Sequence, residues 1–145
     1  VFNLVDRSAL LHEVRLRCPS ISLRVKFLYG QATRLYLGDT HIWSTIGVQQ
    51  GDPLGPLLFA IVLHPLLHKI RDNCKLLLHA WYLDDGTLIG DSEEVAKALD
   101  IITVINPKLG LQLNIKKTEL FWPSCDGRKF QEGLFRRTSG GRLWG

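Results

Sequence analysis

The sequence feature that most constrains the fold is a pair of adjacent carboxylates between two apolar runs. Asp84 and Asp85 are followed by Gly86, with Leu76–Leu83 before them and Thr87–Ile89 after them. Charged side chains are costly to bury, and Asp and Gly are typical turn residues, so the pattern predicts a strand hairpin with both carboxylates at its tip. Asp-Asp-Gly alone is more often an ordinary exposed turn, so its function depends on the motifs around it.

Composition indicates one globular unit. The chain has 145 residues and is 46% hydrophobic, which argues against disorder and allows a modest core.

The charge, the cysteines and the apolar runs limit the possible classes of protein. The net charge of +4 suits a polyanionic partner, although many soluble proteins are mildly basic. Its three cysteines form no CxxC pair, so neither a zinc site nor a disulfide framework is indicated. No apolar run approaches the roughly 20 residues that span a bilayer, and we expect no membrane segment.

Apolar spacing and breaker residues predict an α+β fold with helices packed on an antiparallel sheet. The predicted helices are a segment from Asp6 or Ser8 to Pro19, Ser20–Tyr29, Leu57–Asp72 with a start near Pro53, and Ser92–Ile105. The predicted strands, besides the two at the aspartates, are Thr33–Leu37, His41–Ile46, Leu111–Ile115 and Thr118–Trp122. Residues 123–145 are rich in Gly and Arg without a period, and we expect a poorly ordered tail there.

A second motif precedes the aspartates. The segment 47–59 combines glycines, the amides of Gln49 and Gln50, and the start of a predicted helix. Flexible glycines and a helix N-terminus are suited to close approach by a base pair or a phosphate. A plain helix-entry loop, in which Asp52 and Pro53 act as capping and first-turn residues, is the competing interpretation.

A third motif follows the aspartates in the segment 109–119, where Lys116 and Lys117 stand after Asn114. A lysine near a carboxylate site could protonate a departing pyrophosphate or neutralise a triphosphate. Otherwise both lysines are simply solvated, as most lysines are.

Together these three segments resemble the reverse transcriptase family, and most closely its non-LTR retrotransposon type. The resemblance runs from Val1 to about Lys129, and residues 1–122 are interpreted as a partial palm domain with an incomplete palm-like antiparallel sheet. It implies that the loop and helix from Gln50 to Phe59 contact template and incoming nucleotide. The site residues that it implies are Gln50, Gly51 and Pro53 for substrate and template, Tyr82 beside the primer terminus, Asp84 and Asp85 as metal ligands, and Lys117 as the phosphate-side or general-acid lysine.

The family resemblance also implies an activity. It implies RNA-templated DNA synthesis, in which a primer 3′-hydroxyl attacks a dNTP on a site that holds Mg²⁺, with Mn²⁺ as the alternative ion. The implied partners are an RNA template, a DNA primer and dNTP, while oligomeric state and the choice between cytoplasm and nucleus stay open.

The chain contains no Met and begins with residues typical of a core element, so we expect its N-terminus to be a truncation. In the family a further metal-binding Asp lies about five residues before the position of Phe2, and without that ligand a two-metal site is incomplete. Asp6 belongs instead to the start of the following helix. We therefore expect the isolated chain not to polymerise.

Two other functions compete with this interpretation. An RNA-dependent RNA polymerase commonly has Gly before its two aspartates, where Leu83 stands here. A decayed element copy would be non-catalytic and would at most bind nucleic acid weakly through basic side chains.

Two further groups of residues are not assigned to a site. His64 and His68 have the spacing of a metal pair but lack a third ligand, and the four tryptophans are interpreted as core residues.

Overall fold

The computed structural model describes residues 4–49, 51–121 and 142–144. The chain divides into two compact units, Val1–Leu111 and Gln112–Gly145, and each is described by itself. The expected domain boundary between residues 122 and 123 stays a prediction. Most of the tail expected to be poorly ordered, residues 123–141 and 145, lies outside the described residues.

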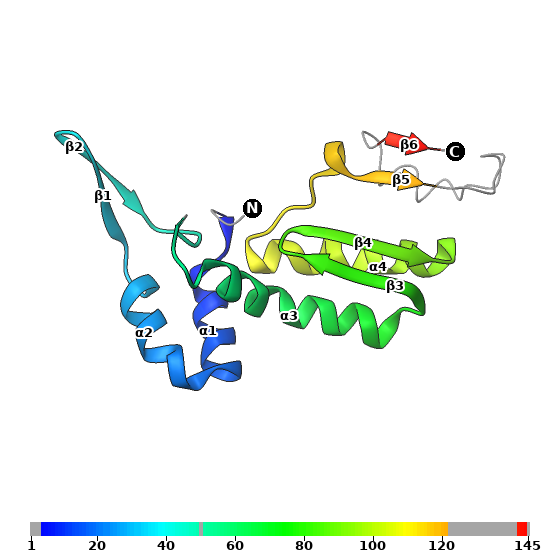
Figure 1. Cartoon of the computed structure of the whole chain (residues 1–145), viewed down its shortest axis with the longest axis horizontal. Helices are drawn as coiled ribbons and strands as arrows, with labels where there is room; N and C mark the ends of the chain where they lie inside the picture. The colour runs from blue at the N-terminus through cyan, green and yellow to red at the C-terminus, as the bar shows by residue number, and fades with distance from the viewer. Residues whose placement is uncertain (1–3, 50, 122–141, 145) are drawn as a thin grey trace. The chain divides into compact units, whose positions relative to one another are not determined.

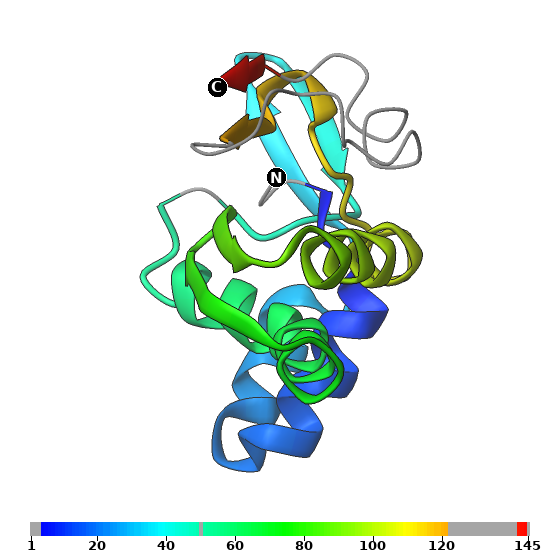
Figure 2. The ribbon, with the colours of Figure 1, turned by 90° about the vertical axis from the view of Figure 1, so that its right-hand side faces the viewer.

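Four helices form the framework of the first unit. They are α1 (Arg7–Arg17), α2 (Pro19–Tyr29), α3 (Gly55–Asn73) and α4 (Ser92–Ile105), close to the predicted segments. Helix α1 packs on α2 and α3, and α3 packs on α4 (Figure 1). Figure 2 shows α3 and α4 nearly end-on and alongside each other. Their shared core contains fully buried side chains, among them Leu10, Val14, Leu58, Phe59, Val62, Leu66, Ile70 and Ala98.

Local signals explain where these helices begin and end. Asp6 caps α1, because its Oδ1 accepts a hydrogen bond of 2.8 Å from the backbone N of Ala9. Pro19 cannot continue α1, so the chain turns at Cys18 and Pro19 begins α2. The assignment of Asp6 to a helix start is therefore confirmed.

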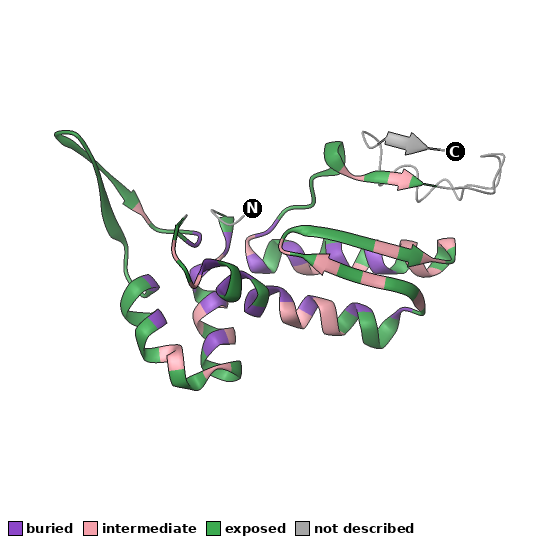
Figure 3. Ribbon diagram, in the orientation of Figure 1, coloured by how far each residue is buried: buried purple, intermediate pink, exposed green. Residues whose placement is uncertain are grey.

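The first hairpin is β1–β2, with β1 at Thr33–Leu37 and β2 at Thr40–Ser44. The strands are antiparallel, and Gly38 in the two-residue turn has a φ of 60°, in the left-handed region that favours glycine. Every residue of β1 is exposed, and so is all of β2 except Ser44 (Figure 3). Trp43 is 50% exposed, so its interpretation as a core residue is wrong.

The second hairpin is β3–β4, with β3 at Leu76–Tyr82 and β4 at Asp85–Gly90. The predicted hairpin is confirmed, but its turn begins one residue earlier than predicted. Leu83 and Asp84 form the turn, and Asp85 is the first residue of β4, paired with Tyr82. The reason is that Leu83 itself takes the left-handed conformation, with a φ of 54°, leaving Gly86 within the strand.

A glycine joins the end of α4 to the start of the chain. The 3-10 helix η2 (Asn106–Leu109) ends at Gly110, which has a φ of 73°. A Cβ added to Gly110 would lie 2.4 Å from the carbonyl oxygen of Leu4, and the N of Asp6 donates to Leu109 O at 3.0 Å. Only glycine allows this approach, so Gly110 fastens segment 4–6 to the helical framework.

The second unit contains η3 (Ile115–Lys117), β5 (Glu119–Phe121) and β6 (Arg142–Trp144). The predicted strand at Leu111–Ile115 is wrong. The Asn114 side chain accepts from the N of Lys117 at 3.3 Å, and Thr118 Oγ1 donates to the carbonyl oxygen of Asn114 at 2.9 Å. These local bonds favour a tight turn over an extended strand.

The α+β class is confirmed, but the described strands do not form one sheet. They form three two-stranded sheets, of which β1–β2 and β3–β4 are antiparallel and β5–β6 is parallel. The likeness to a polymerase palm stays a prediction. No helix in the described part of the chain has the length and apolar character needed to cross a membrane.

Candidate functional site

The two aspartates lie at the open end of hairpin β3–β4. Asp84 is in the turn, and Asp85 faces Tyr82 across the strand pair. All three side chains are exposed, and Tyr82 is 78% exposed. Among the described residues, neither carboxylate accepts a hydrogen bond or forms an ion pair, so their oxygens are available for a ligand.

The opposite face of the same hairpin fixes its position. His79 and Trp81 are partly buried, their rings meet edge to face at 6.1 Å, and β4 packs on α4. Gly86 is the cross-strand partner of Trp81, and a Cβ there would lie 2.9 Å from the indole ring. The indole therefore covers the glycine, which holds the strands together just below the aspartates. Burial also lowers the pKa of His79, which favours its neutral form.

The chemistry of the two carboxylates fits a hard divalent cation, which prefers oxygen ligands. Asp84 and Asp85 are adjacent and exposed at the end of the hairpin, so their carboxylate oxygens are accessible to an ion. Within residues 4–49, 51–121 and 142–144, no group of three or more His, Cys, Asp or Glu side chains is placed to hold a metal. Asp84 and Asp85 are thus a partial ligand set.

The glycine and glutamine loop between β2 and α3 is held by partly buried polar contacts. The Tyr29 hydroxyl donates to Asp52 Oδ2 and accepts from the backbone N of Gln49 at 3.4 Å. Asp52 Oδ1 accepts from the N of Leu54 at 2.9 Å, as in an Asx turn. Burial and the bond to Asp52 raise the pKa of Tyr29 to about 12, so the hydroxyl stays protonated and donates.

Arg7 anchors the base of this loop, a role that the sequence did not single out. It is only 7% exposed, and its guanidinium donates to Gly47 O at 3.1 Å, to Ser44 O and Ser44 Oγ at 2.8 Å each, and to Gln31 O at 3.4 Å. It also lies over the Tyr29 ring at 5.5 Å, and burial lowers its pKa. A signal was available, since Arg7 shares the i, i+3, i+7 spacing of buried Leu10 and Val14.

The loop beside these contacts borders a shallow cavity of about 370 Å³, lined by Leu28, Gln49, Gly51 and Asp52. Gly51 is exposed and has a φ of 86°, so the position favours glycine although a Cβ would meet nothing within 4 Å. An open backbone at this point allows a ligand to approach closely.

The other predicted substrate residues have different outcomes. Gln50 lies outside the described residues. Pro53 is exposed in the turn before α3, which begins two residues later at Gly55, so the expected helix start near Pro53 is confirmed. Asp52 does not cap α3, because the N-cap position is Leu54 and has no side-chain cap bond. The Leu54 N–H donates to Asp52 Oδ1 in the turn before the helix instead.

Lys117 belongs to the second unit, where it is the last residue of η3 and is exposed. Its backbone N donates to the carbonyl oxygen of Asn114 at 3.0 Å. Its role as phosphate-side or general-acid lysine stays a prediction.

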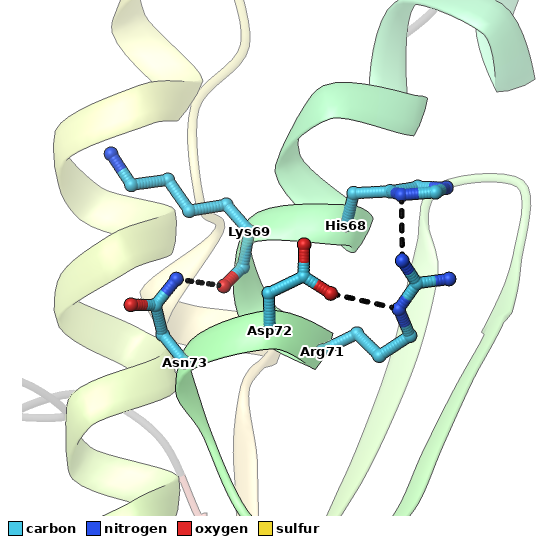
Figure 4. A network of polar contacts seen from close by, with 5 residues as sticks. All are labelled: His68, Lys69, Arg71, Asp72 and Asn73. Atoms are coloured by element: carbon cyan, nitrogen blue, oxygen red, sulfur yellow. Dashed lines mark hydrogen bonds and ion pairs between the residues drawn. The ribbon is translucent and has the colours of Figure 1, made fainter.

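The His64 and His68 pair has contacts that oppose metal binding. The two rings stack at 3.9 Å, and His68 Nδ1 lies 2.9 Å from Arg71 Nη2 (Figure 4). Arg71 in turn pairs with Asp72 at 3.0 Å. A cationic guanidinium at the ring nitrogen of His68 repels a metal ion, and burial lowers the pKa of His64.

Comparison with known proteins defines the class of protein. Residues 2–131 match the family described as reverse transcriptase (RNA-dependent DNA polymerase). This match covers most of the chain, and the chain belongs to the reverse transcriptase family. The resemblance noted from its three motifs is confirmed.

Two curated relatives are proteins of retrotransposable elements. The chain is 36% identical over 81 residues, 55% of its length, to the retrotransposable element SLACS 132 kDa protein of Trypanosoma brucei gambiense. It is 28% identical over 124 residues, 81% of its length, to the retrovirus-related Pol polyprotein from type-1 retrotransposable element R2 of Nasonia vitripennis. The matches span 7% and 11% of these relatives. No solved structure gives a significant match to the chain.

Proposed function

We propose that this chain supplies the metal-binding hairpin and the nucleotide-facing loop of an RNA-directed DNA polymerase, which acts on a dNTP, an RNA template and a DNA primer. The observation that carries the proposal is the position of Asp84 and Asp85. A packed hairpin presents both carboxylates at its exposed end, in a chain of the reverse transcriptase family.

Each residue of the hairpin has a role in this proposal. Asp84 and Asp85 hold Mg²⁺, or Mn²⁺ in its place, through carboxylate oxygens. Divalent ions at such a site supply Lewis-acid activation of a primer 3′-hydroxyl and neutralisation of phosphate charge. Tyr82, beside Asp85 on the open face, presents its ring to the primer terminus.

The loop has a binding role that depends on its anchoring. Gly51 lets the backbone approach a nucleotide or a template base, together with Gln50 and Pro53. Arg7, Tyr29 and Asp52 hold that backbone by bonds that span both sides of the loop. In the same proposal Lys117 neutralises or protonates the pyrophosphate.

A second candidate function is that of a non-catalytic fragment with weak nucleic-acid binding. The observation that favours it is the partial ligand set, since no third candidate ligand lies with Asp84 and Asp85 among the described residues. An ion held by two adjacent carboxylates is bound weakly. We therefore propose that the chain by itself does not polymerise and that a longer protein completes the site.

The test is Mn²⁺ binding, followed by electron paramagnetic resonance of the free ion. We expect the chain to bind Mn²⁺ weakly, and the Asp84→Asn, Asp85→Asn double variant to lose that binding because the oxygen ligands lose their charge. Asp39 in the turn of hairpin β1–β2 provides a matched control, and Asp39→Asn is expected to bind as the unmodified chain does.

Equal Mn²⁺ affinity in the double variant and in the Asp39→Asn control would contradict the metal site. Primer extension on an RNA template with all four dNTPs separates the two functions. Extension by the unmodified chain that Asp84→Asn abolishes would establish a complete polymerase and contradict the predicted inactivity of the chain alone.

A further inference from the structure

Hairpin β1–β2 exposes both of its faces, although it contains large hydrophobic side chains. Tyr36 is 74% exposed, Leu37 71%, Ile42 60% and Trp43 50%. Figure 1 shows the hairpin extending away from α1 and α2, and Figure 3 shows it exposed along almost its whole length. Side chains of this kind are uncommon on a free strand surface, which indicates a binding surface.

The register divides the hairpin into two chemically different faces. Directly opposite residues of an antiparallel pair lie on the same face. Arg34 pairs with Trp43 and Tyr36 with His41, so these four side chains share one face, named here the aromatic strip. The other face carries the cross-strand pair of Leu35 and Ile42 and, two positions along, Leu37.

The aromatic strip is an ordered row. The Arg34 guanidinium lies over the Trp43 ring at 4.8 Å, and Trp43 meets His41 edge to face at 5.9 Å. His41 and Tyr36 continue the row at 6.3 Å. Because these rings already support one another, little side-chain freedom is lost when a ligand stacks on them.

The charge of the strip matches a polyanion. Arg34 is cationic, and no strand position on this face carries a carboxylate. Asp39 lies in the turn rather than on a strand. A cation interleaved with exposed aromatic rings is the arrangement that binds the phosphates and stacks the bases of single-stranded nucleic acid.

We infer that the aromatic strip of hairpin β1–β2 is a binding surface for single-stranded nucleic acid. Trp43 and Tyr36 stack on unpaired bases, and Arg34 contacts a neighbouring phosphate. A paired base does not expose its ring face, so the strip prefers single strands to duplex. The surface is separate from Asp84 and Asp85 and needs no metal ion.

Fluorescence anisotropy of labelled oligo(dT) and oligo(rU), with EDTA present, tests the inference on the full chain. We expect Trp43→Ala to weaken binding by roughly 5- to 150-fold, the range that base stacking on one aromatic ring supports. Arg34→Ala is expected to weaken binding and to reduce the slope of log K against log salt by about one. Binding is also expected to quench tryptophan fluorescence, less so in Trp43→Phe.

A matched control lies on the opposite face of the same strands. The Leu35→Thr, Ile42→Thr double variant changes the neighbouring cross-strand pair and places a β-branched residue, which favours strands, at both positions. It should bind as the unmodified chain does. Because EDTA removes free divalent ions from the assay, failure of the proposed metal site would not affect this result.

Three results would overturn the inference. They are absence of oligonucleotide binding by the unmodified chain, equal loss in the control and strip variants, and binding by Trp43→Ala and Arg34→Ala equal to that of the unmodified chain. A protein interface is the competing occupant. It would appear as a self-associated chain in sedimentation velocity that Trp43→Ala dissociates while oligonucleotide binding is unchanged.

Discussion

Hairpins β1–β2 and β3–β4 are both antiparallel and closed by two-residue turns, but they differ in what covers them. The first has two exposed faces and is anchored at its base, where Arg7 binds Ser44 and Gly47. The second has one partly buried face, on which His79 and Trp81 lie, and β4 packs on α4. The comparison shows that a hairpin can be positioned through its base or through its face.

This difference suits different roles. Positioning through a face fixes the end of β3–β4, where the proposed metal ligands Asp84 and Asp85 lie. Positioning at the base leaves both faces of β1–β2 open for a long ligand.

Arg7→Lys should break the base of hairpin β1–β2. A lysine cannot reproduce the guanidinium bonds to Ser44 and Gly47, and each bond lost from a charged group costs about 1.5–3 kcal/mol. We expect the free energy of unfolding to fall by about 3 kcal/mol in urea titrations. Hydrogen exchange at the Gly47 amide, which donates to Val5 O, should accelerate.

Arg15→Lys is the control for that variant, because Arg15 is exposed on the same helix. Its unfolding free energy should change by less than about 0.5 kcal/mol. Equal losses in the two variants would show that the base of the hairpin does not depend on Arg7.

The two tryptophans test the contrast between the hairpins directly. Trp81→Ala removes a ring packed over Gly86 and should lower the unfolding free energy by about 2 kcal/mol, less than for a fully buried ring. Trp43→Ala removes an exposed ring and should cost under about 1 kcal/mol, mainly its contact with Arg34. Equal losses in thermal or urea unfolding would remove the distinction between the hairpins.

The two glycines give a smaller and sharper effect. Gly86→Ala places a Cβ 2.9 Å from the Trp81 ring and should cost about 1–2 kcal/mol. A Cβ at Gly38 would meet nothing within 4 Å, but the residue has a φ of 60°. Gly38→Ala should therefore lower the free energy of unfolding by about 1 kcal/mol through backbone strain alone. In a Trp81→Ala background the cost of Gly86→Ala should nearly vanish while that of Gly38→Ala persists. A persistent cost of Gly86→Ala there would exclude ring packing as its cause.

Tyr29 gives the smallest effect and a pH dependence. Its pKa is raised to about 12 in the folded chain from 10.0, so the folded state favours the protonated hydroxyl. The resulting stability is complete below pH 10 and is lost as the pH rises from 10 toward 12. The difference in unfolding free energy between the unmodified chain and Tyr29→Phe should therefore shrink across that window. A constant difference would show that burial and the bond to Asp52 do not raise the pKa of Tyr29.

Local sequence rules located most elements because they depend on neighbours a few residues apart. The helix at Ser92–Ile105 and the strand at Thr33–Leu37 have the predicted bounds. The same rules failed where a side chain bonded to nearby backbone, as Asn114 does in place of the expected strand. They also misplaced the turn beside Asp84, because a leucine at positive φ is rarer than a glycine.

The sequence by itself determined the family, the α+β class and the identity of Asp84 and Asp85 as the candidate ligands. Only the tertiary structure decided that Trp43 is exposed while Trp81 covers a glycine, and that Arg7 anchors the loop. The physical reason is the separation along the chain over which each effect acts. Periodicity and turn preferences act over a few residues, whereas Arg7 meets Gly47 across 40 positions of the chain. Such a contact depends on how the helices and strands pack together.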